Sequence, residues 1–247
     1  MLLMIIFLTF GIFFTAYMFD TFLHQEEFFR KHYGIKPPAA DTGTSESNST
    51  EPSVNPVAQS PAKTAEYWEE CVFVGDYVLA DILSGENPPP QDPVLASREL
   101  NTENISAYDT GSGTVSEILS GTHKNIYVML GNHEIGAVPN EEIAQRVKTF
   151  LKEVKETAPD AVIYILPLPP VTAVRETTQI TNALIDSYNV MLLGLADSEG
   201  YYYADINSAL KTESGVLPDI YVNADMTTFK NSTKQIVLDY ILTHTLA

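Results

Sequence analysis

The sequence predicts an α/β domain built as a three-layer α/β/α sandwich around a parallel sheet. Its apolar segments are continuous, which is typical of strands that are buried on both faces of a sheet. Segments with helical periodicity separate them, and strands that alternate with helices form parallel sheets. The sequence contains no internal repeat, no glycine-rich dinucleotide fingerprint and no phosphate-binding loop. In open sheets of this kind, ligands bind at the carboxyl ends of the strands.

Continuous apolar segments mark the predicted strands. In chain order they are 71–74, 105–108, 125–130, 161–166 and 201–206. Tyr77 follows the first of them closely, and His133 follows the third. Because the carboxyl ends of parallel strands lie at one edge of a sheet, we expect these two side chains to be near each other.

Amphipathic segments mark the main helices. Asn140 is expected to cap the first of them, with Glu141 and Glu142 placed favourably in its first turn and Pro159 beyond its end. The last helix is expected near 232–243. The apolar stripes that should face the sheet are Ile143, Val147, Leu151 and Val154 in the first helix, Ile180, Leu184, Tyr188, Leu192 and Leu195 in the second, and Ile236, Tyr240 and Ile241 in the last.

The amino-terminal segment predicts a membrane anchor. Residues 1–19 are apolar or small apart from Thr9 and Thr15 and carry no charge, which is long enough to cross a bilayer as a helix. No basic segment precedes it and no small-residue cleavage site follows it, so a retained signal-anchor is favoured over a cleaved signal peptide. We predict a transmembrane helix at 1–22, a juxtamembrane segment and linker at 23–64, and a folded domain at 65–247.

The linker composition bears on localisation. Residues 37–62 are rich in Pro, Ser, Thr and Ala, a composition that buries too little apolar surface to offset chain entropy. Arg30, Lys31 and Lys36 would favour the cytoplasm for this side of the membrane, whereas the stalk-like composition favours the outside. We expect a membrane-anchored protein with an extracytoplasmic domain.

Charge and cysteine content exclude several classes of partner and cofactor. The formal net charge of −18 argues against nucleic acid and anionic membrane surfaces as partners. Cys71 is the only cysteine, which excludes an intrachain disulfide and a multi-cysteine metal site. A metal site built from His133, Asp76 and Asp225 has no supporting ligand spacing. We therefore expect no metal and no cofactor.

Three turns carry the candidate site. Val72-Phe73-Val74-Gly75-Asp76-Tyr77 reads as a buried strand that runs into a Gly-Asp-x turn, and a second strand ends in Gly131-Asn132-His133-Glu134. Asp225-Met226-Thr227-Thr228 lies before the last helix. In order, spacing and flanking pattern this layout resembles the SGNH (GDSL-type) hydrolases over about residues 65–247. The resemblance implies a flavodoxin-like parallel sheet.

The same resemblance implies that the reacting residues are replaced. In that family the first turn carries the nucleophilic Ser, the second an oxyanion-hole Asn, and the third an Asp-x-x-His pair; this sequence has Tyr77, His133 and Thr228 at those positions. Only Asp225 is kept. The glycine oxyanion donor of the family corresponds to Gly111 or Gly113. The vestigial site is thus predicted to comprise Asp76, Tyr77, Gly111, Gly113, Gly131, Asn132, His133, Glu134, Asp225 and Thr228.

The missing base has no substitute in another register. The sequence has no histidine between Glu134 and Thr243, and His244 lies a helix length beyond Thr228. Asp219 is a second candidate for the acid, but Val222 stands three residues after it. A phenol at Tyr77 would fill the cleft in which an acyl carbonyl should lie.

Three functions follow from this site. The leading hypothesis is a membrane-tethered pseudoenzyme that serves as a binding or accessory module for an acylated glycan or a cell-envelope partner, a ligand class that the resemblance implies. The alternative is an active esterase or acyltransferase with a rewired site that uses His133 and Asp225. The third is a structural envelope protein whose cleft binds nothing.

Overall fold

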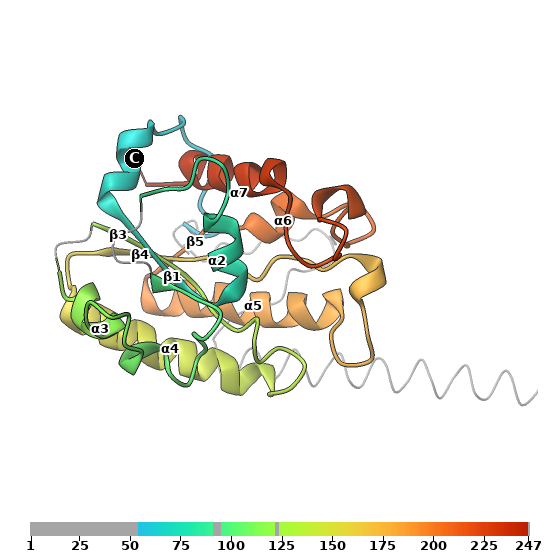
Figure 1. Cartoon of the computed structure of the whole chain (residues 1–247). Helices are drawn as coiled ribbons and strands as arrows, with labels where there is room; N and C mark the ends of the chain where they lie inside the picture. Colours follow the sequence, from blue (N-terminus) through green and yellow to red (C-terminus); the bar gives the residue numbers. More distant parts are fainter. Residues whose placement is uncertain (1–53, 91–94, 122–123, 247) are drawn as a thin grey trace, which may run out of the picture. The chain divides into compact units, whose positions relative to one another are not determined.

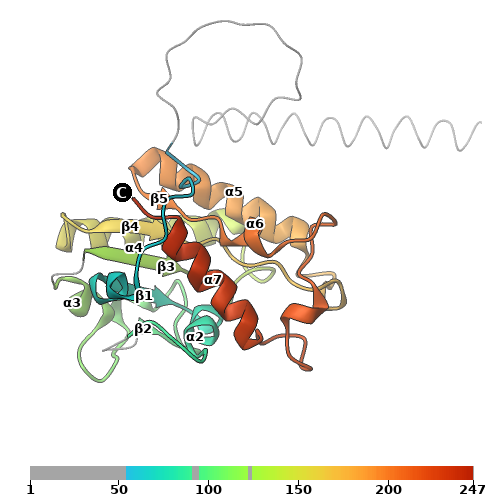
Figure 2. The ribbon, with the colours of Figure 1, turned by 90° about the horizontal axis from the view of Figure 1, so that it is seen from above.

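The computed structural model describes residues 54–90, 95–121 and 124–246. Within them, five parallel strands form one sheet in the order β2-β1-β3-β4-β5 (Figures 1 and 2; β2 is labelled in Figure 2). The strands are β1 Cys71–Gly75, β2 Leu95–Ala96, β3 Asn125–Met129, β4 Val162–Ile165 and β5 Tyr202–Tyr203. This strand order is the flavodoxin-like one.

The central strands are buried on both faces, as their continuous apolar sequences predict. All residues of β1 and β3 are buried, and the two strands pair from Cys71 with Asn125 to Gly75 with Met129. This register places the ends of β1 and β3 side by side. The predicted parallel α/β architecture is therefore confirmed.

Helices cover both faces of the sheet (Figures 1 and 2). One face carries α3 (Val115–Leu119), α4 (Asn140–Thr157) and α5 (Asn182–Glu199), and the other carries α2 (Tyr77–Leu83), α6 (Ile206–Leu210) and α7 (Asn231–Thr243). Short 3-10 helices lie at η1 (Ala65–Glu70), η2 (Ile105–Ala107), η3 (Ala173–Arg175) and η4 (Asp219–Tyr221). The apolar stripe predicted for α4 is buried along its length.

Two predicted strands are corrected by the structure. The segment 105–108 is not a strand, because Ile105–Ala107 forms η2, and the strand beside β1 is instead Leu95–Ala96. A two-residue strand is too short to leave a periodic pattern in the sequence. In the segment 201–206 only Tyr202–Tyr203 pairs with β4, since Asp205 ends the extended stretch by capping α6.

Helix boundaries and faces also differ in detail. Asn140 does not cap α4; it is the first helical residue, and its Nδ2 donates to the Leu184 carbonyl at 3.0 Å. Ile180 precedes α5, which Thr181 caps. In α7 the fully buried apolar residues are Val237, Leu238 and Ile241, whereas Ile236 and Tyr240 are half-buried. The buried face of α7 thus includes Val237 and Leu238, which the predicted stripe omits.

Residues 54–64, predicted to belong to the linker, pack on the domain. Asn55 is buried; its Nδ2 donates to the Tyr201 carbonyl at 3.0 Å, and its Oδ1 accepts from the Tyr203 backbone N–H at 2.7 Å. Val57 donates its backbone N–H to the Tyr203 carbonyl at 2.8 Å. These bonds satisfy the edge of β5, which no further strand covers in the described sheet. The predicted anchor, juxtamembrane segment and most of the linker lie outside the described residues. Among the residues that the structure describes, no helix is long and apolar enough to cross a membrane.

The end of β1 tolerates only glycine, which gives a first prediction. A Cβ at Gly75 would lie 2.4 Å from the Met129 carbonyl oxygen and 2.7 Å from the Leu79 side chain. We expect Gly75→Ala to lower the free energy of unfolding by about 1–3 kcal/mol, because β1 cannot separate from β3 without losing its pairing. Urea denaturation measures this. The matched control is Gly85→Ala, whose Cβ would meet nothing closer than the Lys234 side chain at 3.5 Å. Equal destabilisation of both variants would contradict the prediction.

Candidate functional site

The site lies where β1 and β3 end. Strand order reverses between these two strands, and such a switch point is where doubly wound sheets bind ligands. Asp76 follows β1 as the cap of α2, and Tyr77 is the first residue of that helix. Asn132 and His133 follow β3. The sheet therefore brings the first two predicted turns together.

Asp76 ties the two strand ends to each other. Its carboxylate is fully buried and accepts hydrogen bonds from the Asn132 backbone N–H at 2.9 Å, the Asn132 Nδ2 at 2.9 Å and the Val78 backbone N–H at 3.1 Å. Burial raises the pKa of this carboxyl to about 6, while the N–H donors of Asn132 and Val78 oppose the rise. Asp76 is thus a structural carboxylate that no solvent reaches.

The turn after β3 requires glycine at position 131. Gly131 has φ +117°, and a Cβ there would lie 2.8 Å from the hydroxyl oxygen of Tyr188. That hydroxyl is itself fixed, because it donates to the Leu130 carbonyl at 2.9 Å. Gly131 thereby lets Asn132 turn back to Asp76.

Tyr77 and His133 are neighbours, as predicted. Their ring centroids are 4.9 Å apart and the rings meet edge-on at 65°. The Tyr77 hydroxyl has no hydrogen-bond partner in the described part of the chain. Burial raises the pKa of this phenol and the Asp76 carboxylate raises it further, against an opposing effect of Arg175. The phenol is therefore protonated at neutral pH.

His133 is held by the turn after β2. Its Nε2 lies 2.8 Å from the Arg98 carbonyl oxygen, and because a carbonyl only accepts, this nitrogen carries the proton. The ring is exposed. Glu134, the next residue, is buried: its Oε1 accepts from the backbone N–H and hydroxyl of Thr102 at 2.6 and 2.7 Å. Glu134 thus fastens a loop and does not line the pocket.

Asp225 belongs to a closed turn. Its carboxylate accepts from the backbone N–H groups of Thr227 and Thr228 at 2.9 Å each and from the Thr228 hydroxyl at 2.8 Å. These bonds, the Thr227 N–H first, lower the pKa of Asp225. No hydrogen bond or ion pair joins Asp225 to His133 in the described ranges. The pair that a rewired catalytic site requires is therefore not assembled.

Gly111 and Gly113 lie apart from this constellation. Both have positive φ in a surface turn that the Asp109–Thr114 bridge closes, and Ser112 lies in the same turn. The residues that follow β2 are instead Ser97 and Arg98. Neither glycine lines the pocket.

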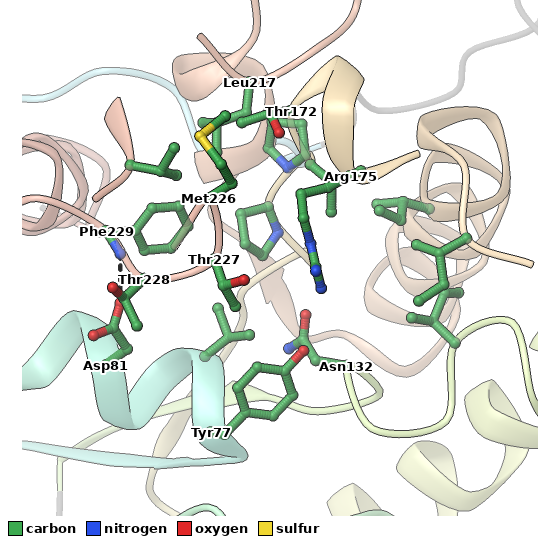
Figure 3. Close-up of a pocket in the computed structure, with 18 of the residues that line it drawn as sticks. Tyr77, Asp81, Asn132, Thr172, Arg175, Leu217, Met226, Thr227, Thr228 and Phe229 are labelled. Atoms are coloured by element: carbon green, nitrogen blue, oxygen red, sulfur yellow. Dashed lines mark hydrogen bonds between the residues drawn. The ribbon is translucent and has the colours of Figure 1, made fainter. Parts of the chain in front are cut away.

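A cavity of about 190 Å³ opens beside Tyr77 (Figure 3). Its lining combines apolar side chains with hydroxyl, amide, guanidinium and carboxylate groups. Its lining comprises Tyr77, Val78, Asp81, Arg98, Asn132, Ile135, Pro169, Pro170, Val171, Thr172, Arg175, Ile180, Ile185, Leu217, Val222, Met226, Thr227, Thr228 and Phe229. The cleft is thus open despite the bulk of Tyr77.

Sequence reasoning missed the two arginines and Thr172. Arg98 follows β2, which the sequence did not predict. Arg175 lies beyond the Pro167-Leu168-Pro169-Pro170 segment at the end of β4. A charged residue shortly after a strand of the sheet was the available signal. In the residues described, no group of three His, Cys, Asp or Glu side chains could hold a metal ion.

Comparison with known proteins places the fold. No protein-family model matches the sequence, and no curated protein matches it significantly. Among solved structures, a candidate platelet activating factor from Streptococcus pneumonia aligns with a TM-score of 0.57 and 17% identity over 92% of this chain and 96% of its own. A candidate acylhydrolase from Bacteroides fragilis has a TM-score of 0.53 and 10% identity over 69% and 83%.

A third structure is similar over a comparable part of the chain. It is a candidate lipolytic protein of the G-D-S-L family from Desulfitobacterium hafniense, with a TM-score of 0.51 and 12% identity over 70% of this chain and 97% of its own. At such identities the likeness shows the fold alone. The described domain has an SGNH-hydrolase-like α/β fold, which hydrolases and esterases share.

The buried carboxyl of Asp76 gives a prediction on pH dependence. Its pKa of about 6 when folded lies above the ordinary value of 3.8, so its stabilising contribution is complete below about pH 4 and is lost as pH rises through 6. The whole window corresponds to about 3 kcal/mol. We expect the unfolding free energy of Asp76→Asn, relative to the unsubstituted protein, to rise between pH 4 and 7.5.

Urea denaturation across this range measures that difference. Asp225→Asn is the matched control, because its carboxyl has a lowered pKa and should show no such rise. A difference that stays constant with pH in Asp76→Asn would refute the assignment.

Proposed function

We propose that this domain binds a ligand in the cleft beside Tyr77 and does not hydrolyse esters. The observation that carries the proposal is the state of the hydroxyl at the nucleophile position. Tyr77 presents a protonated phenol whose pKa burial raises, and no base among the described residues accepts its proton. Attack on an ester needs a hydroxyl that a neighbouring base activates.

The two groups that could supply a base are engaged elsewhere. His133 meets Tyr77 through ring edges and donates its Nε2 proton to the Arg98 carbonyl. Asp225, which would orient a base in a triad, accepts hydrogen bonds only from its own turn. Without orientation by a carboxylate, an imidazole loses most of its effect as a general base.

The open cleft supports binding rather than a purely structural role. Its apolar lining residues suit an acyl chain or the apolar face of a sugar, and a few polar groups lie among them, as in small-molecule sites. An acylated glycan or another acyl compound of the cell envelope is the ligand class that we propose. We also propose that residues 1–22 tether the domain to a membrane with the domain outside the cytoplasm.

Ester hydrolysis tests the proposal directly. The full chain should not hydrolyse p-nitrophenyl acetate above background, because loss of the nucleophilic Ser or of the His alone costs roughly a million-fold in turnover in a triad enzyme. Tyr77→Ser, His133→Asn and Thr228→His should each remain inactive when made singly, since a triad acts as a unit. Activity is expected only when the three changes are combined.

One result would overturn the proposal. If the unsubstituted chain hydrolyses the ester and either Tyr77→Phe or His133→Ala abolishes the reaction, the site is catalytic and rewired. Val174→Ala, at an exposed position outside the pocket lining, is the control for non-specific effects.

A further inference from the structure

Arginines without ion-pair partners gather at the pocket. The described residues contain three arginines, and Arg146 pairs with Glu103 at 2.8 Å and Glu142 at 2.6 Å. Arg98 and Arg175 make no ion pair within the described ranges, and both line the cavity. The chain has 32 acidic and only 14 basic residues. Both side chains are exposed at the cavity and are therefore accessible to a ligand.

Arg175 is directed into the site. Figure 3 shows its guanidinium extending from η3 toward Asn132 and the hydroxyl of Tyr77. Its charge reaches both Tyr77 and Asp225, since it lowers the pKa of each. Its backbone is fixed by a hydrogen bond from its N–H to the Thr172 carbonyl at 2.9 Å.

The backbone of Arg98 is also anchored at the pocket. Its carbonyl accepts the Nε2 proton of His133 at 2.8 Å. His133 therefore positions the turn that carries Arg98. An Asn would not make both contacts in the same way, because the His133 ring reaches from Tyr77 to the turn after β2. This contact holds Arg98 beside the cleft.

Thr172 supplies an independent sign of a ligand. Its side chain is only 1% exposed, and its Oγ1 has no hydrogen-bond partner. A buried hydroxyl without a partner costs free energy, which a ligand atom in the adjoining cavity would recover. The residue lies in the pocket lining three positions before Arg175.

The acidic groups near the pocket have partners other than the arginines in the described part of the chain. Asp81 is neutralised by Lys234 Nζ at 2.9 Å and also accepts from the Phe229 backbone N–H at 2.8 Å. Asp76 is bound by Asn132 and is fully buried. Asp225 points its oxygens at its own turn. None of these carboxylates pairs with Arg98 or Arg175 within the described residues, so both guanidinium groups remain available to a ligand at the cavity.

We propose that the pocket binds a ligand through a carboxylate group, which Arg175 and Arg98 hold and to which Thr172 contributes a hydrogen bond. The planar guanidinium matches a carboxylate in two parallel hydrogen bonds. The apolar part of the ligand packs on the wall formed by Pro169, Val171 and Ile180. This inference rests on the proposed binding function and specifies the chemical class of the ligand.

Calorimetric titration of the full chain, carried in neutral phosphatidylcholine nanodiscs with empty nanodiscs subtracted, tests the proposal. The probes are octanoate, glucuronate and octanamide, which separate an acyl carboxylate from a sugar carboxylate and from a neutral analogue. We expect a carboxylate probe to bind at least about tenfold more tightly than octanamide. Tighter binding of octanoate would identify an acyl acid, and tighter binding of glucuronate a sugar acid.

Variants locate the effect. Arg175→Gln should weaken binding of the carboxylate about tenfold or more and leave octanamide unchanged, and Arg175→Lys should fall between because it keeps the charge but loses the planar fork. Arg146→Gln is the matched control and should have no effect. Equal affinities for octanoate and octanamide, no binding of either carboxylate, or an equal loss in Arg146→Gln would each overturn the proposal. Ester hydrolysis that depends on Tyr77 would instead defeat the proposed function, whatever the arginine variants do.

Discussion

The carboxylate of Asp76 is the constraint on which the site depends. It joins the two central strands at their carboxyl ends by accepting N–H donors from the start of α2 and from the turn after β3. A buried acid with two oxygens and several donors fixes the relative position of these elements, because any displacement would leave a buried polar group unpaired. Tyr77 and His133 follow Asp76 and Asn132 by one residue each. Their edge-on contact is thus a consequence of this tie.

The residues that build the fold are distinct from those that a hydrolase would use to react. Gly75 and Gly131 have no room for a Cβ atom, and the Asp76 carboxylate is needed as the acceptor of the Asn132 backbone N–H. Tyr77 and His133 instead present half-buried or exposed rings to the cavity or the solvent, and Thr228 lies at its rim. We expect substitution of Tyr77, His133 or Thr228 to disturb the packing of the core little. The framework can therefore keep its shape while the chemistry at its surface changes, and a likeness in fold does not establish activity.

The sequence predicted what long apolar segments determine. β1, β3 and β4, their parallel arrangement and the approach of Tyr77 to His133 all follow from continuous hydrophobic runs with polar ends. The sequence predicts a strand at 105–108 and not at β2, because Leu95–Ala96 is too short to form a pattern. The glycine donor was therefore expected after 105–108, at Gly111 or Gly113, and not after β2. Asn140 resembled a cap but bonds to a carbonyl on α5, a tertiary contact that no local signal reveals. Arg175 was missed because its role depends on the loops that surround it.

Electrostatics links these observations to function. A guanidinium loses little by facing solvent, but at the edge of an apolar cavity its field is screened less than on an open surface. Arg98 and Arg175 are exposed and pair with no carboxylate of the described residues, whereas Arg146 pairs with Glu103 and Glu142. The first two are therefore free to meet an anionic ligand. A protonated phenol at Tyr77 is compatible with such an anion, since it can donate a hydrogen bond where a catalytic serine would need to attack. Under the proposed function, Tyr77 thus gives the pocket a further hydrogen-bond donor for a bound carboxylate.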